Sequence, residues 1–253
     1  MNFEIKNVAK TVAVSILLAA CGGGGSSDTP TGSAEGIYGG ALTGSTSSAF
    51  QMLVLENDEV WTMYGTQTAT EFSVAGFLQG QGQSNNGTYT SSNLRDFGFN
   101  PALSGTATAT YNSSSKTISG TATFPGAAVG FSGGPISGSL YNYNTAATVS
   151  TVAGSWALTS LSGEGITLNV ASDGTYMASS SLGCSFTGTL VPRASGKNVF
   201  NVSFSFGPSP CALPNQAASG IAVAYPLANG RTQLIVAGAN SARTIGTAAS
   251  GTR

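Results

Sequence analysis

Histidine is absent from the 253-residue chain. Its absence removes the commonest general base, the usual base partner of serine and cysteine nucleophiles, and the commonest ligand of zinc and copper. We therefore expect a protein that is not an enzyme and that holds neither a metal ion nor a cofactor.

Charged residues are also scarce, at 8% of the chain. If the amino-terminal segment that contains Glu4, Lys6 and Lys10 is removed as an export signal, seven basic and nine acidic residues remain. The basic residues are scattered from Arg95 to Arg253, whereas nucleic-acid binders need a basic stripe to contact phosphates. Nucleic acid is therefore not an expected partner.

Two sequence patterns could still suggest catalysis. Paired carboxylates hydrolyse glycosides without histidine, and Glu56, Asp58 and Glu59 lie close together. Because functional acids need a cleft that perturbs them, we interpret this cluster as a solvated hairpin turn. Residues 130–134 formally match Gly-x-Ser-x-Gly, which has meaning only at a strand-to-helix turn beside a histidine. We interpret them as a loop.

No apolar run in the amino-terminal segment is long enough to cross a membrane. Lys6 and Lys10 precede a short apolar run over residues 11–18, and Ala19 and Ala20 follow it. Crossing the hydrocarbon needs roughly twenty apolar residues, so residues 1–20 are predicted to be a signal peptide.

The sequence Leu18-Ala19-Ala20-Cys21 resembles the lipobox of bacterial lipoproteins. The resemblance implies that Cys21 becomes the first mature residue, with a diacylglycerol on its thiol and a further acyl chain, such as palmitate, on its amino group. A diacylglycerol and a further acyl chain together anchor a protein stably in a membrane. Gly22 stands where an Asp retains such lipoproteins at the inner membrane, so the resemblance favours the outer membrane. The alternative is an ordinary signal peptide followed by an incidental cysteine.

Residues 21–34 consist mainly of Gly, Ser and Thr and have nothing to pack. We expect a flexible tether that spans roughly 20 Å between the lipid and the folded part.

The remaining chain reads as two copies of one unit, residues 35–148 and residues 149–253. Four landmarks recur at a displacement of about 115 residues. The pairs are 36–38 with 154–156, 52–55 with 166–170, 61–64 with 175–177, and 104–111 with 219–225. We therefore predict two tandem units related by internal duplication.

Within each unit the apolar residues alternate with a period of two. Phe200–Phe206 places its apolar residues on one face, as a half-buried strand does. Turn residues separate such runs at 56–58, 85–87, 112–115, 173–174 and 229–230, which suits antiparallel hairpins. The pattern predicts an all-β fold with seven or eight strands per unit, either a sandwich or an up-and-down barrel, rather than one sixteen-stranded pore. Gly-x-Tyr and Gly-x-Trp near the unit starts resemble the opening of lipocalin-type barrels.

Two cysteines remain once Cys21 is lipidated. Cys184 and Cys211 form an even pair in an exported protein, so we predict a disulfide. Free thiols and a redox pair are the alternatives, and the latter is disfavoured because the spacing is far from Cys-x-x-Cys.

Two classes of function remain open. The first is a lipid-anchored binding module for a ligand or protein, which is similar in architecture to the transferrin-binding and factor-H-binding surface lipoproteins. Its candidate contacts are Trp61, Tyr64, Trp156 and Tyr176, although aromatic residues in strands are more typical of core. The second is a structural or assembly component of the cell envelope that faces the periplasm.

Overall fold

The computed structural model of the protein describes residues 32–68, 71–136 and 138–253. The predicted signal peptide (residues 1–20), Cys21 and most of the predicted tether lie outside these residues. The described part contains sixteen strands and one 3-10 helix: β1 (Gly36–Thr43), β2 (Ala49–Val54), β3 (Glu59–Gln67), β4 (Phe72–Asn85), β5 (Thr88–Asp96), β6 (Leu103–Asn112), β7 (Thr117–Phe124), β8 (Ala127–Gly134), η1 (Val149–Thr151), β9 (Gly154–Ser160), β10 (Gly165–Val170), β11 (Thr175–Ser180), β12 (Ser185–Pro192), β13 (Phe200–Phe206), β14 (Ala217–Pro226), β15 (Thr232–Ala239) and β16 (Gly246–Thr252).

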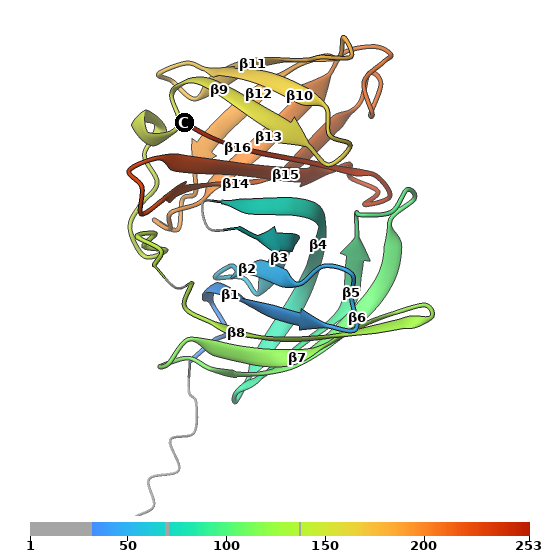
Figure 1. The fold of residues 1–253 in the computed structure, drawn as a ribbon, viewed down its shortest axis with the longest axis vertical. Helices are drawn as coiled ribbons and strands as arrows, with labels where there is room; N and C mark the ends of the chain where they lie inside the picture. Colours follow the sequence, from blue (N-terminus) through green and yellow to red (C-terminus); the bar gives the residue numbers. More distant parts are fainter. Residues whose placement is uncertain (1–31, 69–70, 137) are drawn as a thin grey trace, which may run out of the picture.

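The strands form two closed barrels, each made of eight consecutive strands (Figure 1). Every strand pairs antiparallel with the next, and the last strand of each barrel closes on the first, β8 on β1 and β16 on β9. We call β1–β8 barrel 1 and β9–β16 barrel 2. The predicted all-β fold of two tandem antiparallel units is confirmed, and both units are up-and-down barrels rather than sandwiches.

The duplicated landmarks lie on equivalent strands of the two barrels: β1 and β9, β2 and β10, β3 and β11, β6 and β14. The likeness extends to side-chain contacts at the first strand. The Tyr38 hydroxyl donates to the Ala34 carbonyl at 2.6 Å, and the Trp156 indole N–H donates to the Val152 carbonyl at 2.7 Å. Both acceptor residues have no exposed surface. Each barrel is therefore closed at one end by the residues that precede its first strand.

Gly32 and Ala34 are held against the closed end of barrel 1. The Tyr111 hydroxyl donates to the Gly32 carbonyl at 2.7 Å, and the Ala34 N–H donates to the Ser84 hydroxyl at 2.9 Å. Because strand direction alternates, the β1–β2, β5–β6 and β7–β8 connections lie at the other end, which we call the mouth, whereas the β3–β4 hairpin bends back so that Phe72 reaches Gln233 of β15. The chain therefore enters barrel 1 opposite its mouth.

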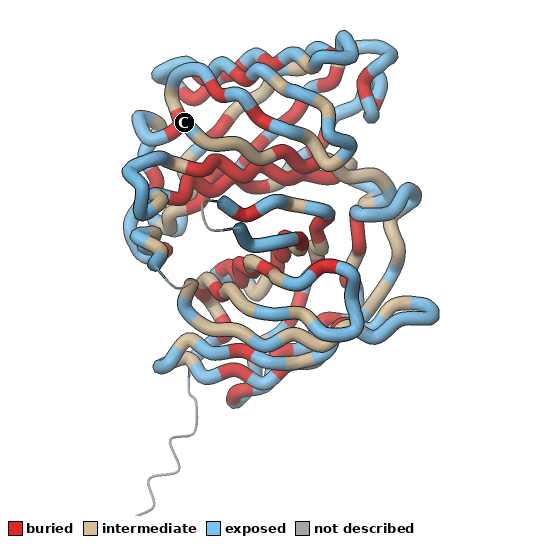
Figure 2. The backbone as a smooth tube through the Cα atoms, viewed as in Figure 1, coloured by how far each residue is buried: buried red, intermediate tan, exposed pale blue. Residues whose placement is uncertain are grey.

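The two barrels pack side by side through the outer faces of β2–β4 and of β14–β16. The shared apolar cluster includes Trp61, Phe77 and Phe97 from barrel 1 and Ile221 and Ile235 from barrel 2. The Trp61 and Phe77 rings stack at 5.9 Å between centroids, and the Phe77 and Phe97 rings at 4.7 Å. Figure 2 shows the resulting buried band along β14 and β15. Ile221–Tyr225 of β14 and Leu234–Ala239 of β15 are buried on both faces, which explains their continuous runs of apolar or small residues.

Polar contacts fix how the barrels meet. The side chain of Gln233, 2% exposed, donates to the Phe72 carbonyl at 2.9 Å and accepts from the Phe72 N–H at 3.4 Å. At the mouth end, the Arg243 guanidinium donates to the carbonyls of Gln79 and Asn93, each at 2.8 Å. Bonds of this kind to charged donors are stronger than neutral ones, so both barrel mouths are held in one orientation.

The predicted disulfide between Cys184 and Cys211 is confirmed. It joins the β11–β12 turn to the β13–β14 connection, and both cysteines are buried. The bridge therefore fixes two of the connections at the mouth of barrel 2.

Candidate functional site

Each barrel contains a cavity that opens at its mouth. Cavity 1, in barrel 1, has a volume of about 430 Å³, and cavity 2, in barrel 2, about 330 Å³. Both volumes lie within the range of small-molecule sites, roughly 300–1,000 Å³.

Cavity 1 is hollow because small residues point inward on β6 and β7. On β6 the exposed Thr106 and Thr108 alternate with the inward Gly105 and Ala107, and on β7 Ala122 also lines the cavity. Larger side chains at these inward positions would fill the barrel, as they do in small closed barrels. The remaining wall is apolar and includes these side chains: Leu42, Phe50, Met52, Val60, Leu78, Leu94, Ile118, Phe124, Val129 and Phe131.

The ionisable groups of cavity 1 are Asp96 and two tyrosines, Tyr64 and Tyr89. Asp96 is 8% exposed, and its Oδ1 accepts from the Tyr64 hydroxyl at 2.7 Å and from the Gly98 N–H at 2.9 Å. Burial raises the pKa of the Asp96 carboxyl, while these two hydrogen bonds act in the opposite direction. Burial and the neighbouring carboxylate raise the pKa of Tyr64, so its hydroxyl remains a donor. Cavity 1 thus places one hydrogen-bonding carboxyl group beside an apolar chamber.

Replacing Asp96 by asparagine is expected to change how stability depends on pH. Because the folded state raises the pKa of Asp96 above its ordinary value of 3.8, the folded chain binds this proton more tightly than the unfolded chain does. As the pH rises from 3.8 through the raised pKa, the buried Asp96 carboxyl loses its proton, and the free energy of unfolding of the wild type falls.

Asp96→Asn keeps an oxygen that can accept from Tyr64 and Gly98 but does not titrate. Its stability relative to the wild type should therefore increase over that pH window. Urea denaturation of both proteins at a series of pH values measures the difference. A difference that is the same at every pH would contradict the expectation.

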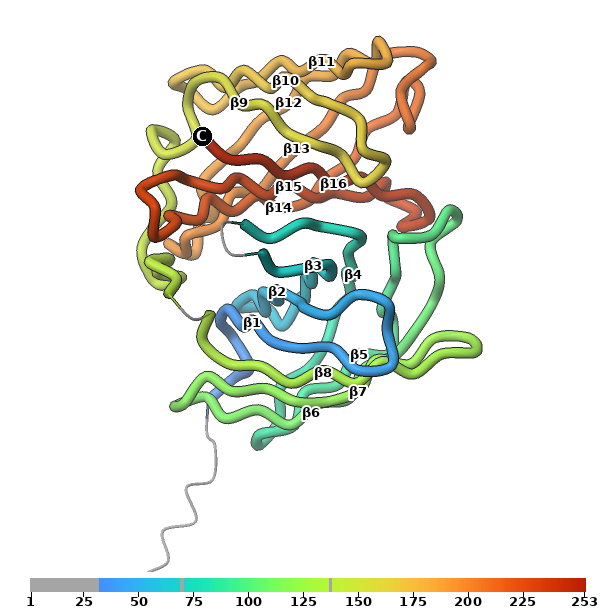
Figure 3. The backbone as a smooth tube through the Cα atoms, viewed as in Figure 1, coloured from blue at the N-terminus to red at the C-terminus, as the bar shows by residue number. Residues whose placement is uncertain are grey.

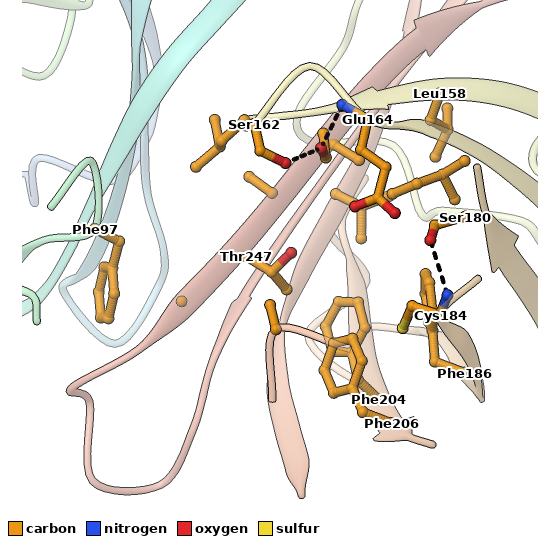
Figure 4. Close-up of a pocket in the computed structure, with 18 of the residues that line it drawn as sticks. Phe97, Leu158, Ser162, Glu164, Ser180, Cys184, Phe186, Phe204, Phe206 and Thr247 are labelled. Atoms are coloured by element: carbon orange, nitrogen blue, oxygen red, sulfur yellow. Dashed lines mark hydrogen bonds between the residues drawn. The ribbon is translucent and has the colours of Figure 1, made fainter. Parts of the chain in front are cut away.

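Cavity 2 has an aromatic wall and a polar rim (Figure 4). Phe186, Phe204 and Phe206 form the wall with ring centroids 5.2 to 6.5 Å apart, and Tyr176 packs edge-on against the first two. The Tyr176 hydroxyl donates to the Ser203 carbonyl at 2.8 Å and so needs no other partner in the cavity.

The rim of cavity 2 carries one carboxylate, Glu164, together with hydroxyl groups. Glu164 lies beside the β9–β10 turn, where its N–H donates to the Ser160 hydroxyl at 3.0 Å and one carboxylate oxygen accepts from the Leu182 N–H at 3.2 Å. Thr247 of β16 also lines the cavity. Figure 4 shows Glu164 and Thr247 across the opening from the aromatic wall. Cavity 2 therefore repeats the plan of cavity 1, with an apolar chamber and one acid.

The two cavities share a rim at the β5–β6 connection, where Gly98 and Phe99 line both. Phe97 anchors this connection in the cluster between the barrels, and the Ala102 N–H donates to the Thr244 carbonyl at 2.8 Å. Figure 3 shows the connection beside the β15–β16 turn. Gly246 is required here, because a Cβ at this position would lie 2.5 Å from the Phe97 ring. The shared rim is therefore fixed by both barrels.

Of the four aromatic residues predicted as candidate ligand contacts, two line the cavities and two do not. Tyr64 lines cavity 1 and Tyr176 lines cavity 2. Trp61 is buried between the barrels, and Trp156 is buried at the closed end of barrel 2. The cavities themselves have no sequence signal except the alternation of Thr and Ala along β6.

Residues 56–58 form the β2–β3 turn, as interpreted, and Glu56 is exposed, but each of Glu56, Asp58 and Glu59 also has a hydrogen-bonding partner. Glu56 pairs with Arg193 of barrel 2 at 2.8 Å. The carboxylate of Asp58 accepts from the Ser84 N–H at 3.0 Å, and that of Glu59 accepts from the Trp61 indole at 2.9 Å. These acids thus have structural roles in the turn and the interface.

The prediction of a loop at residues 130–134 is wrong, because these residues form part of β8, paired with β1 and β7. Ser132 is exposed on the outside of the barrel and faces Ala41 and Ser119 in the neighbouring strands. The segment is rich in glycine and has few apolar residues, so the alternation typical of a strand is not visible in its sequence.

In the described part of the chain, no cluster of three or more Cys, Asp or Glu side chains is arranged to hold a metal ion. No helix among the described residues is long and apolar enough to span a membrane.

No protein-family model matches the sequence, and no curated protein matches it significantly. Among solved structures, the chain is similar to a protein of unknown function of the DUF3598 family from Nostoc punctiforme PCC 73102. The comparison covers 86% of this chain and 94% of that chain, at 10% sequence identity and a TM-score of 0.25.

Proposed function

We propose that this protein is a lipid-anchored lipoprotein of the outer membrane that binds uncharged apolar molecules in its barrels and catalyses no reaction. The observation that carries the binding function is that both barrels contain an apolar cavity with an open mouth. Such cavities with a few placed polar groups are the usual form of small-molecule sites. The anchor is supported by the lipobox-like residues before Cys21.

The chemistry of the cavities favours an uncharged ligand. Among the described residues, neither lining includes a Lys or Arg, and each includes one acid, Asp96 or Glu164. An anionic group would be repelled by these carboxylates and would have no cation to pair with. A hydroxyl group, in contrast, can donate to either acid.

Binding can be tested with Nile red, an uncharged dye that fluoresces in apolar surroundings. The full chain carrying Cys21→Ser is used, because a chain without lipid needs no detergent, and detergent would compete for the cavities. We expect saturable fluorescence that falls by about half when either cavity is filled. Ala107→Trp fills cavity 1, and Thr247→Trp fills cavity 2.

Outward tryptophans on the same barrels serve as matched controls. Thr108 on β6 and Thr187 on β12 are exposed, so Thr108→Trp and Thr187→Trp should leave dye binding unchanged. Urea denaturation verifies that all four variants are folded. Equal dye binding by the wild type and by the variant with both cavities filled would refute the proposed binding function.

The anchor has its own test in cells. Cys21→Ser is expected to move the protein from the membrane fraction to the soluble fraction and to abolish labelling by radioactive palmitate, because Cys21 is predicted to carry both the diacylglycerol on its thiol and the acyl chain on its amino group. Retention of the variant in the membrane fraction would contradict anchoring through Cys21. Protease treatment of intact and permeabilised cells then tells whether the barrels face outward or face the periplasm.

A further inference from the structure

The two cavities lie close enough to serve a single ligand. The barrels pack with their closed ends together, where Glu56 of barrel 1 meets Arg193 of barrel 2. Their mouths are also together, where Gly98 and Phe99 line both cavities. The β5–β6 connection therefore separates the two mouths.

Two large apolar side chains are exposed at the mouths. Phe99 is 55% exposed, and Leu182 on the β11–β12 turn beside the mouth of barrel 2 is 71% exposed. Large apolar side chains at such exposure on a ligand-site rim favour contact with an apolar ligand. Phe97 and the Ala102–Thr244 hydrogen bond hold the connection that carries Phe99, so the spacing of the mouths is fixed.

We propose that the two cavities together bind one uncharged amphiphile with two apolar chains, of the diacylglycerol type, with one chain in each barrel. The head group lies over Phe99, between the acids Asp96 and Glu164, to which its hydroxyl can donate. This inference rests on the proposed binding function and adds the class of ligand. Linking two chains makes the second binding step intramolecular, so a two-chain ligand gains affinity without new contacts.

Monooctanoylglycerol and dioctanoylglycerol test this inference as a pair, because they share the glycerol head and an octanoyl chain, and dioctanoylglycerol carries a second chain in place of one hydroxyl. Calorimetric titration of the Cys21→Ser chain should give two molecules of monooctanoylglycerol per protein but one of dioctanoylglycerol. Dioctanoylglycerol should bind roughly 100-fold tighter or more. Either Ala107→Trp or Thr247→Trp should reduce its affinity to that of monooctanoylglycerol. The same single variants should halve the number of monooctanoylglycerol sites without changing the affinity of the remaining site.

The outcomes separate the two proposals. If monooctanoylglycerol binds at two sites but dioctanoylglycerol also binds twice, or keeps its affinity when one cavity is filled, the two-chain inference is overturned and the binding function stands. If neither compound binds, both are overturned. The variants Thr108→Trp and Thr187→Trp should behave as the wild type in every titration.

Discussion

Replacing Trp61 by alanine is expected to lower the free energy of unfolding by about 3–5 kcal/mol, the usual loss when a large buried aromatic side chain is removed. Trp61 is 5% exposed, although it lies on the outer face of barrel 1. Its ring stacks on Phe77 in the cluster between the barrels, and its indole donates to Glu59. The variant would leave a cavity between the barrels and a carboxylate with one donor fewer. Urea denaturation, followed by far-ultraviolet circular dichroism, measures the loss.

Met177 provides the matched control, because it lies on the outer face of β11, the strand of barrel 2 that is equivalent to β3. It is 70% exposed, and Met177→Ala should change the free energy of unfolding by no more than about 0.5 kcal/mol. The shared cluster also predicts that the wild type unfolds in one transition, with both barrels lost together. Equal effects of the two substitutions, or two separate transitions in the wild type, would contradict the packed interface.

Removing the disulfide by the double substitution Cys184→Ala and Cys211→Ala is expected to lower the free energy of unfolding by about 3.5 kcal/mol. The bridge closes a segment with a sequence separation of 27, and restricting a segment of this length in the unfolded chain is worth about that much in the chain-entropy model. Alanine is preferred to serine because both positions are buried and a hydroxyl would need a partner. Urea denaturation in the Cys21→Ser background gives the value.

A reductant supplies the control for this experiment. Dithiothreitol should destabilise the protein that contains the bridge by a similar amount and should leave the double alanine variant unchanged. The variant should also bind ligands less well in cavity 2, because the bridge fixes two connections at its mouth. A loss below about 1 kcal/mol would show that the bridge does not restrict the unfolded chain as expected.

The strands and turns could be predicted because their signals are local. Phe200–Phe206 alternates buried and exposed residues along its whole length, as its sequence indicates. Asn86 and Gly87 between β4 and β5, and Gly174 between β10 and β11, have positive φ angles that these residue types accept at low energy. All five predicted turns connect consecutive strands, as the hairpin pattern indicates, but that pattern does not distinguish an up-and-down barrel from a sandwich.

The contact between the barrels could not be predicted from periodicity. Leu234–Ala239 is buried at every position, which shows both faces covered, but a continuous apolar run does not say what covers them. Its partners, Trp61 and Phe77, are more than 150 residues away in the sequence. For the same reason the sequence does not indicate that Glu56 pairs with Arg193 of the other barrel.

The cavities depend on the volume of the inward side chains rather than on the alternation of inward and outward residues. Inward Gly105 and Ala107 satisfy the same alternation as inward Leu or Phe would, yet only the small residues leave space inside a barrel of eight strands. Asp96 gave no sequence signal, because its role comes from burial and from the Tyr64 hydroxyl. The candidate site thus emerges only when the strands are closed around it.

The most direct test of the central claim is a crystal structure of the Cys21→Ser chain with monooctanoylglycerol that carries bromine at the end of its chain. Anomalous scattering should place one bromine inside each barrel, beneath Asp96 in cavity 1 and against Phe204 in cavity 2. Bromine peaks only on the outer surface, or empty barrels at a concentration that saturates binding in solution, would contradict the assignment of the barrels as ligand-binding chambers.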